Sequence, residues 1–506
     1  MTLGELVAGV GSVDGAGSDV EIAGLAYDSR LVAPGTLFFC VPGFRSDGHD
    51  FAAQAVAAGA VALVVERPLG LGVPEVLVPS VRAAMGPIAS RFYGDPSAAL
   101  RVVGVTGTNG KTTTAFLVRA LLQAVGEQAG LLGTVTSIVG GQERPTDSRS
   151  TGSSIGQRTT PEAIDLHAGF RAMLDGDDRA CAIEVSSHAL ELGRAGGTRF
   201  AAAVFTNLTQ DHLDFHPSME DYFLAKRLLF LPGEGPPPGV SVVNVGDSYG
   251  RRLASEIAGA RTFALDAPAD YSATDLRCNF AGCRFALHTP AGTREVSLPM
   301  PGRFNVANAL GALATVHALG FDLDTLVAAL QQGVRVPGRF EPVDAGQDFA
   351  VLVDYAHTPD SLENVLRSAR DIARGRRVIS VFGAGGDRDR GKRPMMGAIS
   401  ARLADITLIT SDNPRSEEPA EIVTEILSGI PPTALSDGSV HVEVDRHAAI
   451  EQALSLAMPD DVVVIAGKGH EQGQEFADGR KEPFDDLTIA RELLTAGVGA
   501  PAETDE

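Results

Sequence analysis

The sequence predicts an α/β protein of three domains, in which strands and helices alternate along most of the chain. Its 506 residues are too many for a single hydrophobic core, which favours two to four domains. From Arg101 onward, short apolar runs that are typical of buried strands alternate with helical patterns. Continuous apolar strands joined by helices indicate parallel sheets that are covered on both faces.

Changes in this pattern divide the chain into three parts and a tail. We expect a small α/β domain over residues 1–98, a central domain with a parallel or mixed sheet over 99–336, a Rossmann-like domain over 337–496 and a disordered tail over 497–506. In the first part, the runs TLFFCV and VALVVE predict strands, and FAAQAVAAGA predicts a helix. The last part predicts five strands, in the runs FAVLVDY, RVISVFG, DITLITSD, HVEVD and DVVVIAGKG.

Polar clusters follow several predicted strands at the point where each strand ends. These clusters are TGTNGKTTT, DYAHTPD, FGAGGDRDRGKR, SDNPRSEE and GKGHEQ. In open α/β sheets, ligands bind at the carboxyl ends of the strands. The sequence therefore predicts an active-site cleft formed by these clusters.

Composition excludes several classes of function. With 42 basic and 64 acidic residues, the formal charge is −22, which argues against a nucleic-acid partner. No apolar run approaches the roughly 18 residues that span a bilayer, so we expect no membrane insertion. The start, MTLGELVAGVGSV, carries Glu5 and no basic cluster, which is unlike a secretory signal. We therefore expect a cytoplasmic protein.

The four cysteines form no C-x-x-C pair, which argues against a zinc site. Cys278 and Cys283 are the only two that lie close together in the sequence, and Cys40 and Cys181 stand alone. Reduced thiols are the expectation for a cytoplasmic chain.

The segment RVVGVTGTNGKTTTAFL predicts a phosphate-binding loop between a strand and a helix. Glycines let backbone N–H groups converge on an anion, and the helix N-terminus adds its dipole. Lys111 would reach the β- and γ-phosphates, and a threonine hydroxyl would hold Mg²⁺. A plain strand-to-helix turn is the alternative, but strand, loop, Lys-Thr and helix all occur in order. The predicted ATP contacts in this loop are Gly107, Thr108, Asn109, Gly110, Lys111, Thr112 and Thr113.

The loop is one residue out of register with the common G-x-x-x-x-G-K-[ST] pattern, because its first glycine is Gly104. In this register, GVTGTNGKTTT resembles the nucleotide loop of the Mur ligases and their folylpolyglutamate synthetase relatives. Further matching segments follow the family's order: DSR, TTPE, EVSSHAL, TNLTQDHLDFH, AKRLLF, GRFNVANAL, DYAHTPDSL, GGDRDRGKRPMM, SDNPRSEEP and GKGHE. The resemblance covers nearly the whole chain. It implies an ATP-dependent amide ligase in which ATP phosphorylates a carboxylate and an amine attacks the acyl phosphate.

The resemblance assigns the catalytic roles to Lys111, Glu184, His212 and Lys226. Glu184 follows the apolar run ACAI and could ligate Mg²⁺, although a buried paired carboxylate at a strand end has the same pattern. His212 alone would be an ordinary packed loop histidine. Lys226 lies in the amphipathic segment MEDYFLAKRLLF, where a lone lysine is normally solvated. The resemblance implies that CO₂ carbamylates this lysine, which needs a neutral amine, and that Thr112, Glu184, His212 and the carbamate hold the metal.

The same resemblance implies ATP contacts outside the loop, at Asn305, Asn308, Arg339, Asp354 and His357. Arg339 follows Pro337-Gly338 and could neutralise the γ-phosphate when the last domain closes. A hinge salt bridge for Arg339, and a capping turn for Asp354 and His357, are the alternatives from the residues alone.

Two substrates are implied. The first is a UDP-muramoyl dipeptide, UDP-N-acetylmuramoyl-L-alanyl-D-glutamate. Its implied contacts are Ser29, Phe44, Arg45, Ser46, Thr159, Thr160, Ser186 and Arg194. For YDSR and GFRSDGHD, which hold the first four of these residues, polar surface turns are an equally good description.

The second substrate is the amine, and DNPR resembles the segment that selects diaminopimelate. Diaminopimelate is lysine with a second carboxylate at its far α-carbon, and Arg415 has the planar fork to bind that carboxylate bidentately. Lysine would leave Arg415 unpaired, and such discrimination reaches about 10⁴-fold. The implied contacts are Arg388, Asp412, Asn413, Pro414, Arg415, Gly467 and Glu471.

The resemblance thus implies a ligase that adds diaminopimelate to the D-glutamate carboxylate of the dipeptide in peptidoglycan precursor synthesis, and we expect it to be a monomer. Addition of lysine or D-Ala-D-Ala, or folylpolyglutamate synthesis, would keep the fold and change the acceptor. A nucleotide-binding regulator without catalysis is a further alternative, which the joint presence of the four catalytic residues disfavours.

Overall fold

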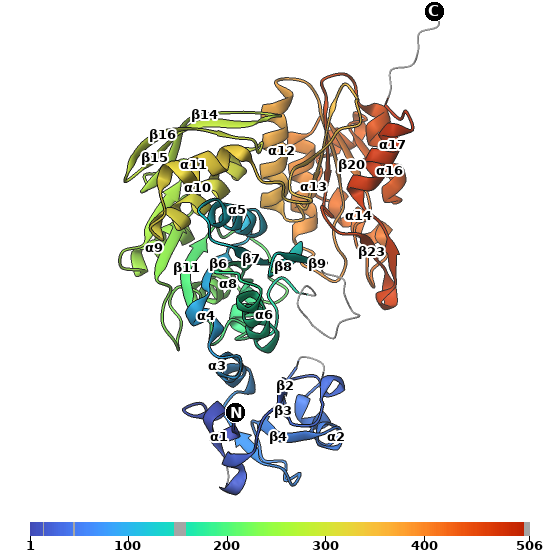
Figure 1. The fold of residues 1–506 in the computed structure, drawn as a ribbon. Coiled ribbons are helices and arrows are strands. Elements are labelled where there is room, and N and C mark those ends of the chain that lie inside the picture. The colour runs from blue at the N-terminus through green and yellow to red at the C-terminus, as the bar shows by residue number, and fades with distance from the viewer. Residues whose placement is uncertain (14, 44–45, 146–157, 500–506) are drawn as a thin grey trace, which may run out of the picture.

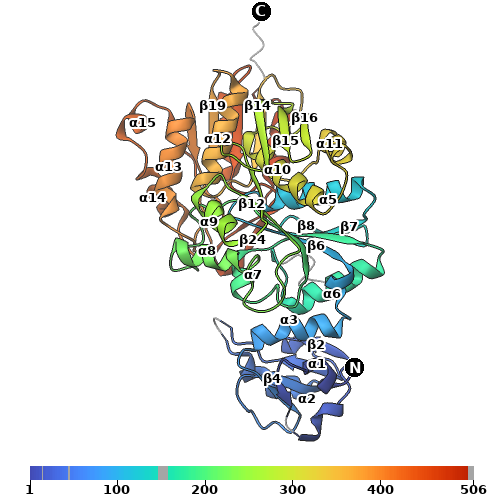
Figure 2. The same ribbon diagram turned by 90° about the vertical axis from the view of Figure 1, so that its left-hand side faces the viewer.

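The computed structural model describes residues 1–13, 15–43, 46–145 and 158–499 (Figure 1). The predicted α/β fold is confirmed: three sheets, each accompanied by helices, succeed one another along the chain. Figures 1 and 2 show the N-terminal sheet at one end of the molecule, joined through α3 (Val81–Phe92) to the larger central part. The C-terminal sheet lies beside the central part, at the end away from the N-terminal sheet.

The N-terminal sheet has the strand order β1-β5-β4-β3-β2 and is parallel except for the β1–β5 pair. Its elements are α1 (Leu3–Val7), β1 (Ser12–Val13), η1 (Gly15–Asp19), β2 (Gly24–Ala26), η2 (Ser29–Leu31), β3 (Thr36–Phe39), η3 (Gly48–Phe51), α2 (Ala52–Ala57), β4 (Ala60–Val65) and β5 (Glu75–Leu77). The predicted strands TLFFCV and VALVVE are β3 and β4. The core of this part also takes in Ala163 and Ile164 of the central part, which fixes the two against each other.

The central sheet has eleven strands in the order β16-β15-β14-β13-β12-β11-β6-β10-β7-β8-β9. Its elements are α4 (Pro96–Ala99), β6 (Arg101–Thr106), α5 (Lys111–Ala124), β7 (Ala129–Leu132), β8 (Thr136–Val139), β9 (Gln142–Pro145), α6 (Ala163–Asp175), β10 (Ala180–Glu184), α7 (Ser187–Glu191), β11 (Phe200–Phe205), α8 (Met219–Arg227), β12 (Val240–Asn244), α9 (Ser248–Glu256), β13 (Arg261–Ala264), β14 (Tyr271–Asn279), β15 (Gly282–Thr289), β16 (Gly292–Leu298), α10 (Arg303–Ala318) and α11 (Leu323–Gln332). Helices α5, α10 and α11 pack on one face and α6, α8 and α9 on the other. In the order of the sheet, the seven neighbouring strands β14-β13-β12-β11-β6-β10-β7 are parallel, so β6, β10 and β11 end at the same edge.

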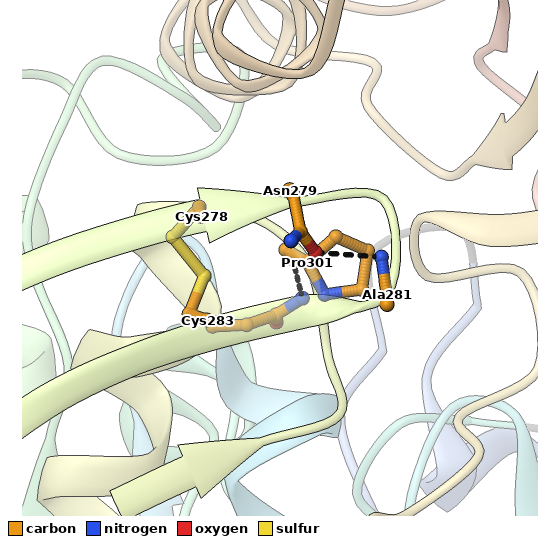
Figure 3. Close-up of a disulfide and its surroundings, with 6 residues drawn as sticks. Cys278, Asn279, Ala281, Cys283 and Pro301 are labelled. Atoms are coloured by element: carbon orange, nitrogen blue, oxygen red, sulfur yellow. Dashed lines mark hydrogen bonds between the residues drawn. A yellow bond between two sulfur atoms is a disulfide. The ribbon is translucent and has the colours of Figure 1, made fainter.

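Antiparallel strands extend this sheet at both ends, which the alternation of strands and helices did not predict. One extension is β8–β9 and the other is β14–β15–β16. In the hairpin β14–β15, Cys278 and Cys283 face each other in register, with Cα atoms 4.1 Å apart, and form a disulfide (Figure 3). The prediction of reduced thiols is therefore wrong for this pair, because strand pairing brings together two residues that look like a chance spacing in the sequence. Cys40 and Cys181 are free and buried.

The C-terminal sheet has the order β17-β18-β22-β19-β20-β21 and is parallel except at β17. Its elements and those of the small sheet after it are β17 (Glu341–Val343), β18 (Ala350–Asp354), α12 (Pro359–Ala373), β19 (Val378–Phe382), α13 (Lys392–Leu403), β20 (Ile406–Ile409), α14 (Pro419–Leu427), α15 (Pro432–Ser436), β21 (Val440–Val442), α16 (Arg446–Leu456), β22 (Val462–Ala466), β23 (Gly473–Glu475), η4 (Ala477–Gly479), β24 (Lys481–Pro483) and α17 (Asp486–Thr495). Helices α12 to α14 cover one face, and α16 and α17 cover the other. All five predicted strands are present. Because β18, β22, β19 and β20 are parallel neighbours, the polar segments that follow them meet at one edge.

The limits predicted at residues 98, 336 and 496 stay predictions, although the strands of the three large sheets fall between them. Of the predicted tail, residues 500–506 lie outside the described part of the chain. Among the described helices, none is long and apolar enough to cross a membrane.

Candidate active site

A cavity of about 800 Å³ lies where the central and C-terminal sheets meet, and both contribute to its wall. Seventeen of the residues predicted from sequence line it: Thr108, Asn109, Gly110, Lys111, Thr112, Thr113, Thr159, Glu184, Ser186, Arg194, His212, Lys226, Asn308, Arg339, Asp354, His357 and Arg388. These residues come from segments up to 280 positions apart, so the fold gathers them as the strand-end argument predicts.

The phosphate loop runs from the end of β6 to the start of α5. Gly107 and Gly110 have φ angles of 150° and 83°, which favour glycine. They are also crowded: a Cβ on Gly110 would lie 2.3 Å from Asn308 Oδ1, and one on Gly107 would lie 1.9 Å from Thr206 Oγ1. Lys111 folds back over the loop and donates to the carbonyls of Gly107 and Thr108, at 3.0 and 2.7 Å. The Lys111 side chain thus ties the start of α5 to the carbonyls of the loop.

Glu184 ends strand β10, which is the parallel neighbour of β6, and therefore lies beside the phosphate loop. Its carboxylate accepts hydrogen bonds from Thr112 Oγ1 at 3.0 Å and from the backbone N–H of Thr134 at 2.8 Å. Two of the four predicted metal ligands, a hydroxyl and a carboxylate, are therefore in direct contact.

Lys226 is buried rather than solvated, with a relative exposure of 1%. Its Nζ donates to the carbonyl of Gly107 at 2.8 Å and lies 4.5 Å from the centre of the Tyr222 ring. Burial, followed by repulsion from the Lys111 ammonium, holds the pKa of Lys226 well below its ordinary value. Neither ion pairs nor carboxylate hydrogen bonds are made by this lysine within the described residues. The Lys226 amine therefore favours its neutral form in that position.

His212 also lines the cavity. It lies in the segment between β11 and α8 and has a positive φ of 55°. Burial lowers the pKa of His212, against the opposing attraction of the Asp211 carboxylate. A neutral imidazole, the form that binds metals, is therefore favoured at neutral pH. Across the described residues, no group of three or more His, Cys, Asp or Glu side chains is arranged to hold a metal ion. The predicted ligand set would thus depend on Thr112 and on a carbamate at Lys226.

The C-terminal part touches the phosphate loop directly. Arg339 donates from Nη2 to Thr112 Oγ1 at 3.0 Å and stacks on the Tyr355 ring at 4.5 Å. Asn109 Nδ2 donates to Asp360 Oδ2, in the first turn of α12, at 2.6 Å. Sequence reasoning missed Asp360, which reads as an ordinary acidic residue at a helix start.

Asp354 and His357 lie on the segment between β18 and α12. Asp354 Oδ2 accepts from the backbone N–H of Phe340 at 2.6 Å, and burial raises the pKa of this carboxyl to about 6. His357 Nδ1 lies 2.7 Å from the carbonyl of Tyr355. The capping role considered for these two residues belongs instead to Thr358, which caps α12 with its hydroxyl.

The far end of the cavity is lined by apolar side chains that sequence reasoning missed: Phe263, Leu265, Phe304 and Val365. They come from the end of β13, the start of α10 and one face of α12, so no local pattern groups them. Asn305 lies outside this wall, because it is buried and donates to the carbonyl of Pro301 at 2.8 Å. Its neighbour Asn308 lines the cavity instead.

Beyond the cavity wall, the segments after β20 and β22 form a group that we call the acceptor cluster. Its members are Asp412, Asn413, Arg415, Gly467, Lys468, Glu471 and Glu475. Asn413 Nδ2 donates to Glu471 Oε2 at 2.8 Å, and a Cβ on Gly467 would lie 2.6 Å from Asp412 Oδ2. The Tyr355 hydroxyl, at the cavity, donates to Glu471 Oε1 at 3.3 Å. The cluster and the cavity are therefore separated by one side chain.

Arg415 occupies a strained position, with a φ of 52°, at the end of the predicted DNPR segment. Its Nε donates to Glu475 Oε2 at 3.1 Å and its Nη1 to the carbonyl of Gly386 at 2.7 Å. Among the described residues, these contacts use two of the five guanidinium hydrogens and leave those on Nη2 for an incoming carboxylate. Glu475 was not predicted, since nothing in its sequence context distinguishes it. Pro414 follows Asn413 in the same turn.

Beneath the cluster, a fully buried pair ties its two segments together. Arg446 forms an ion pair with Asp486 at 2.7 Å, and both side chains have 0% exposure. The guanidinium also donates to the carbonyls of Ser411 and Ala466, at 3.3 and 2.9 Å. Ser411 follows strand β20 and Ala466 ends strand β22, so Arg446 ties together the two segments that carry the cluster.

The residues predicted for the UDP-muramoyl dipeptide fall into two groups. Thr159, Ser186 and Arg194 line the cavity, while Thr160 lies behind it and donates to the carbonyl of Glu184 at 2.9 Å. Ser29, whose Oγ donates to Gln54 Oε1 at 3.4 Å, and the exposed Ser46 lie in the N-terminal part. Phe44 and Arg45 lie outside the described residues.

Comparison with known proteins identifies relatives over the whole chain. The Mur ligase family catalytic domain matches residues 21–93, the Mur ligase middle domain matches 105–316, and the Mur ligase glutamate ligase domain matches 338–469.

Two curated relatives illustrate the similarity. The UDP-N-acetylmuramoyl-L-alanyl-D-glutamate–2,6-diaminopimelate ligase of Gloeobacter violaceus is 46% identical and covers 98% of each chain. The protein of the same name from Syntrophomonas wolfei is 43% identical, over 95% of this chain and 96% of its own. A solved structure of a protein with that name has a TM-score of 0.69 at 32% identity, over 98% of this chain and 99% of that one.

Proposed function

Because the chain belongs to the Mur ligase family, we propose that it joins diaminopimelate to UDP-N-acetylmuramoyl-L-alanyl-D-glutamate with hydrolysis of ATP to ADP and phosphate. The observation that carries this proposal is the identity of 46% over 98% of both chains to a ligase named for these two substrates. The acceptor cluster supports the choice of amine, because it combines Arg415 with the carboxylates of Asp412 and Glu471. A guanidinium and carboxylates match the carboxylate and ammonium at the far end of diaminopimelate.

In the first step, a carboxylate oxygen of the dipeptide's D-glutamate attacks the γ-phosphorus of ATP, and the bond to the β-phosphate oxygen breaks. Catalysis of such a transfer needs alignment and charge neutralisation. The backbone N–H groups of the phosphate loop and the Lys111 ammonium would hold the phosphates. Arg339, already on Thr112, would add a third source of positive charge from the C-terminal part.

In the second step, the amine of diaminopimelate attacks the carbonyl carbon of the acyl phosphate. The amide C–N bond forms, the C–O bond to phosphate breaks, and the amine loses a proton. The acceptor cluster would hold the far end of the amino acid, so that its near amine enters the cavity past Tyr355. Holding both reactants in line replaces an encounter in solution with a step inside one complex.

We propose that Mg²⁺ takes part, held by Thr112, Glu184, His212 and a carbamate on Lys226. When bound, Mg²⁺ neutralises charge on the phosphate oxygens. The residues fit such an ion: Glu184 is oriented by Thr112 and Thr134, and Lys226 is a buried amine whose pKa is held low. Addition of CO₂ to that neutral amine, with loss of a proton, gives an anionic carbamate in its place.

Replacement of Lys226 by alanine tests the carbamate. We expect Lys226→Ala to lower turnover by about 10³-fold or more, because the metal site loses an anionic ligand. Added short-chain carboxylic acids should restore part of the activity by occupying the space of the carbamate. Arg227→Ala, which removes a half-exposed cation on the same helix, is the matched control and should change turnover less than twofold. A fully active Lys226→Ala would refute the carbamate.

Phosphate release tests the function itself. The protein, ATP, Mg²⁺ and the UDP-muramoyl dipeptide are mixed with meso-diaminopimelate, LL-diaminopimelate, L-lysine or D-Ala-D-Ala, and phosphate and amide product are measured. We expect release that depends on a diaminopimelate isomer, with one amide formed per phosphate. Release with lysine alone would overturn the role of Arg415 but keep the ligase chemistry. No acceptor-dependent release, from protein that binds ATP, would favour folate-type substrates or a regulatory role.

We further propose that the reaction takes place in the cytoplasm, which supplies ATP, and that one chain suffices for it. Both sides of the cavity come from a single chain. Sedimentation of the active protein as a single species of 52.6 kDa would support the monomer.

A further inference from the structure

We propose that Lys468 is a positioning residue for the acceptor amino acid, which holds Asn413 and Glu471 in the arrangement that receives the amine substrate. This inference rests on the proposed function. Lys468 lies in the segment that links β22 to β23, next to Gly467, and its side chain has 0% exposure. A fully buried lysine is rare unless its charge is paired.

The contacts of Lys468 are directed at two residues of the acceptor cluster. Its Nζ donates to Glu471 Oε2 at 2.9 Å and to Asn413 Oδ1 at 3.0 Å. The Asn413 amide in turn donates from Nδ2 to the same Glu471 oxygen at 2.8 Å. Lys468, Asn413 and Glu471 thus form a closed triangle of hydrogen bonds. This triangle fixes which face of the Asn413 amide carries its oxygen, and it also fixes the orientation of the Glu471 carboxylate.

The triangle extends to Arg415 through the backbone. Asn413 Oδ1 also accepts from the N–H of Glu475 at 2.9 Å, and the side chain of Glu475 binds Arg415. Lys468 therefore stands at the start of a chain of contacts that reaches both groups proposed to bind the far end of the acceptor, the Glu471 carboxylate for its ammonium and the Arg415 guanidinium for its carboxylate. Buried networks of this kind respond as a unit when one member is removed.

Lys468 also offsets the charge of the cluster, to which Asp412, Glu471 and Glu475 bring three carboxylates. Burial of Glu471 would raise its pKa, but the Lys468 ammonium and the Asn413 amide hold the pKa below its ordinary value. An ionised Glu471 is the form that accepts hydrogen bonds from a substrate ammonium. The other titratable or charged groups around Glu471 are Tyr355 and His357 after β18 and Arg446 on α16.

A purely structural role for Lys468 is less consistent with its contacts. The strand ends below the cluster are already tied by Arg446 and Asp486, which are equally buried. Lys468 makes neither of these bonds. Nor is it part of the cavity wall, so it is not placed to touch ATP or the dipeptide. Its side-chain hydrogen bonds within the described chain go to Asn413 and Glu471 alone.

The test compares Lys468→Met with the wild-type enzyme and with Lys481→Met, a matched control that removes an exposed lysine from the nearby strand β24. KM for diaminopimelate, ATP and the dipeptide, and kcat, are measured between pH 5.5 and pH 8.5. We expect Lys468→Met to raise KM for diaminopimelate by about 10- to 100-fold and to change the other two KM values less than threefold. Lys481→Met should match the wild type throughout.

The pH profile separates positioning from general loss of structure. Without the ammonium, burial of Glu471 dominates and its pKa rises, so that KM of Lys468→Met for diaminopimelate should fall as pH rises from 5.5 to 8.5. The wild-type KM for diaminopimelate should not depend on pH in this way. An unchanged KM for diaminopimelate in Lys468→Met, or equal losses for all three substrates with no dependence on pH, would overturn the inference.

Two further outcomes are covered by the same design. If Lys468→Met does not fold, the wild type and Lys468→Gln decide. A wild-type KM for diaminopimelate that rises at acidic pH overturns the inference. A wild-type KM without that rise, together with a raised KM for diaminopimelate in Lys468→Gln, supports it. If the wild type shows no diaminopimelate-dependent phosphate release, the proposed function fails. The KM ratio of Lys468→Met to wild type, measured with whichever amine the wild type accepts, then still decides the role of Lys468.

Discussion

The phosphate loop and the acceptor cluster lie on opposite sides of the same site and are built in different ways. The phosphate loop is made from backbone groups at one strand-to-helix turn, and its shape depends on glycines such as Gly107 and Gly110. The acceptor cluster is made from side chains of several segments, which are held together by charged hydrogen bonds such as Lys468–Glu471 and Arg415–Glu475.

The two constructions suit two tasks: the loop binds the triphosphate, which does not vary, and the cluster selects the amine, which does. Triphosphate is the same in every reaction of this kind, and a local backbone cradle is sufficient for it. The amine distinguishes one ligase from another, and a charged side-chain network can be altered one residue at a time. We therefore expect changes in the cluster to affect one substrate selectively and changes in the loop to affect nucleotide binding.

Among the changes that test this comparison between the two regions, the largest effect is expected at Arg415. Arg415→Lys keeps the charge but loses the planar fork, so kcat/KM for diaminopimelate should fall by about 10³-fold, or about 4 kcal/mol, while KM for ATP is unchanged. Discrimination against lysine should fall in parallel, and steady-state kinetics with both amines measures it. Arg480→Lys, on the exposed hairpin β23–β24, is the control. An equal loss with both amines would argue against carboxylate recognition.

A smaller effect is expected in the loop. Gly110→Ala places a methyl group 2.3 Å from Asn308 Oδ1 at a φ of 83°, so we expect the affinity for ATP to fall by about 30-fold, or about 2 kcal/mol. Gly126→Ala separates strain from crowding, because Gly126 has a φ of 87° but no atom within 4 Å of the added Cβ. That variant should lose stability and keep its ATP affinity, as titration calorimetry would show. Equal ATP affinity in both variants would contradict the crowding argument.

The smallest effect concerns pH and Asp354, between the two regions. Burial raises the folded-state pKa of Asp354 to about 6 from an ordinary 3.8, so the native state binds the proton more tightly than the unfolded state. Its contribution to stability is therefore full below pH 3.8 and is lost as pH rises to about 6. Asp354→Asn does not titrate, so its free energy of unfolding relative to wild type should rise by about 1–2 kcal/mol between pH 4 and pH 7.

Calorimetric melting of both proteins at the two pH values measures this difference. Asp348→Asn, which changes an exposed carboxylate in the same sheet region, should show little dependence on pH. If the difference in free energy of unfolding between Asp354→Asn and wild type stays constant or falls as pH rises, Asp354 is ionised in the folded state throughout this range.

Much of the fold follows from local pattern. The parallel strands β6, β18, β19, β20 and β22 are continuous apolar runs, and each was predicted from that feature. The antiparallel strands β14 to β16 carry mixed polarity and lie at the end of the sheet, so their sequence resembles that of loops. The disulfide in this hairpin was missed for the same reason, since cross-strand register is a property of pairing and not of spacing.

The site divides in the same way. Residues on one motif, such as Lys111 and Arg415, could be predicted because the motif fixes their surroundings. Lys468, Glu475 and Asp360 could not, because each acquires its role only from a partner between 3 and 251 positions away. Burial is the missing information for Lys226 as well, which reads as a solvated helical lysine and lies in the interior.

The contacts of Arg339 with Thr112 and of Asp360 with Asn109 also bear on timing. An acyl phosphate that meets water is hydrolysed, and a turnover of ATP then yields no bond. Arg339 and Asp360 belong to the C-terminal part of the chain, as the acceptor cluster does, so the arrangement that sets them against the loop also sets the cluster beside the cavity. On the proposed mechanism, activation of the carboxylate and binding of the amine would then take place in the same arrangement of the chain. A ligase of this design would lose little acyl phosphate to water, because the amine would already be bound when the intermediate forms.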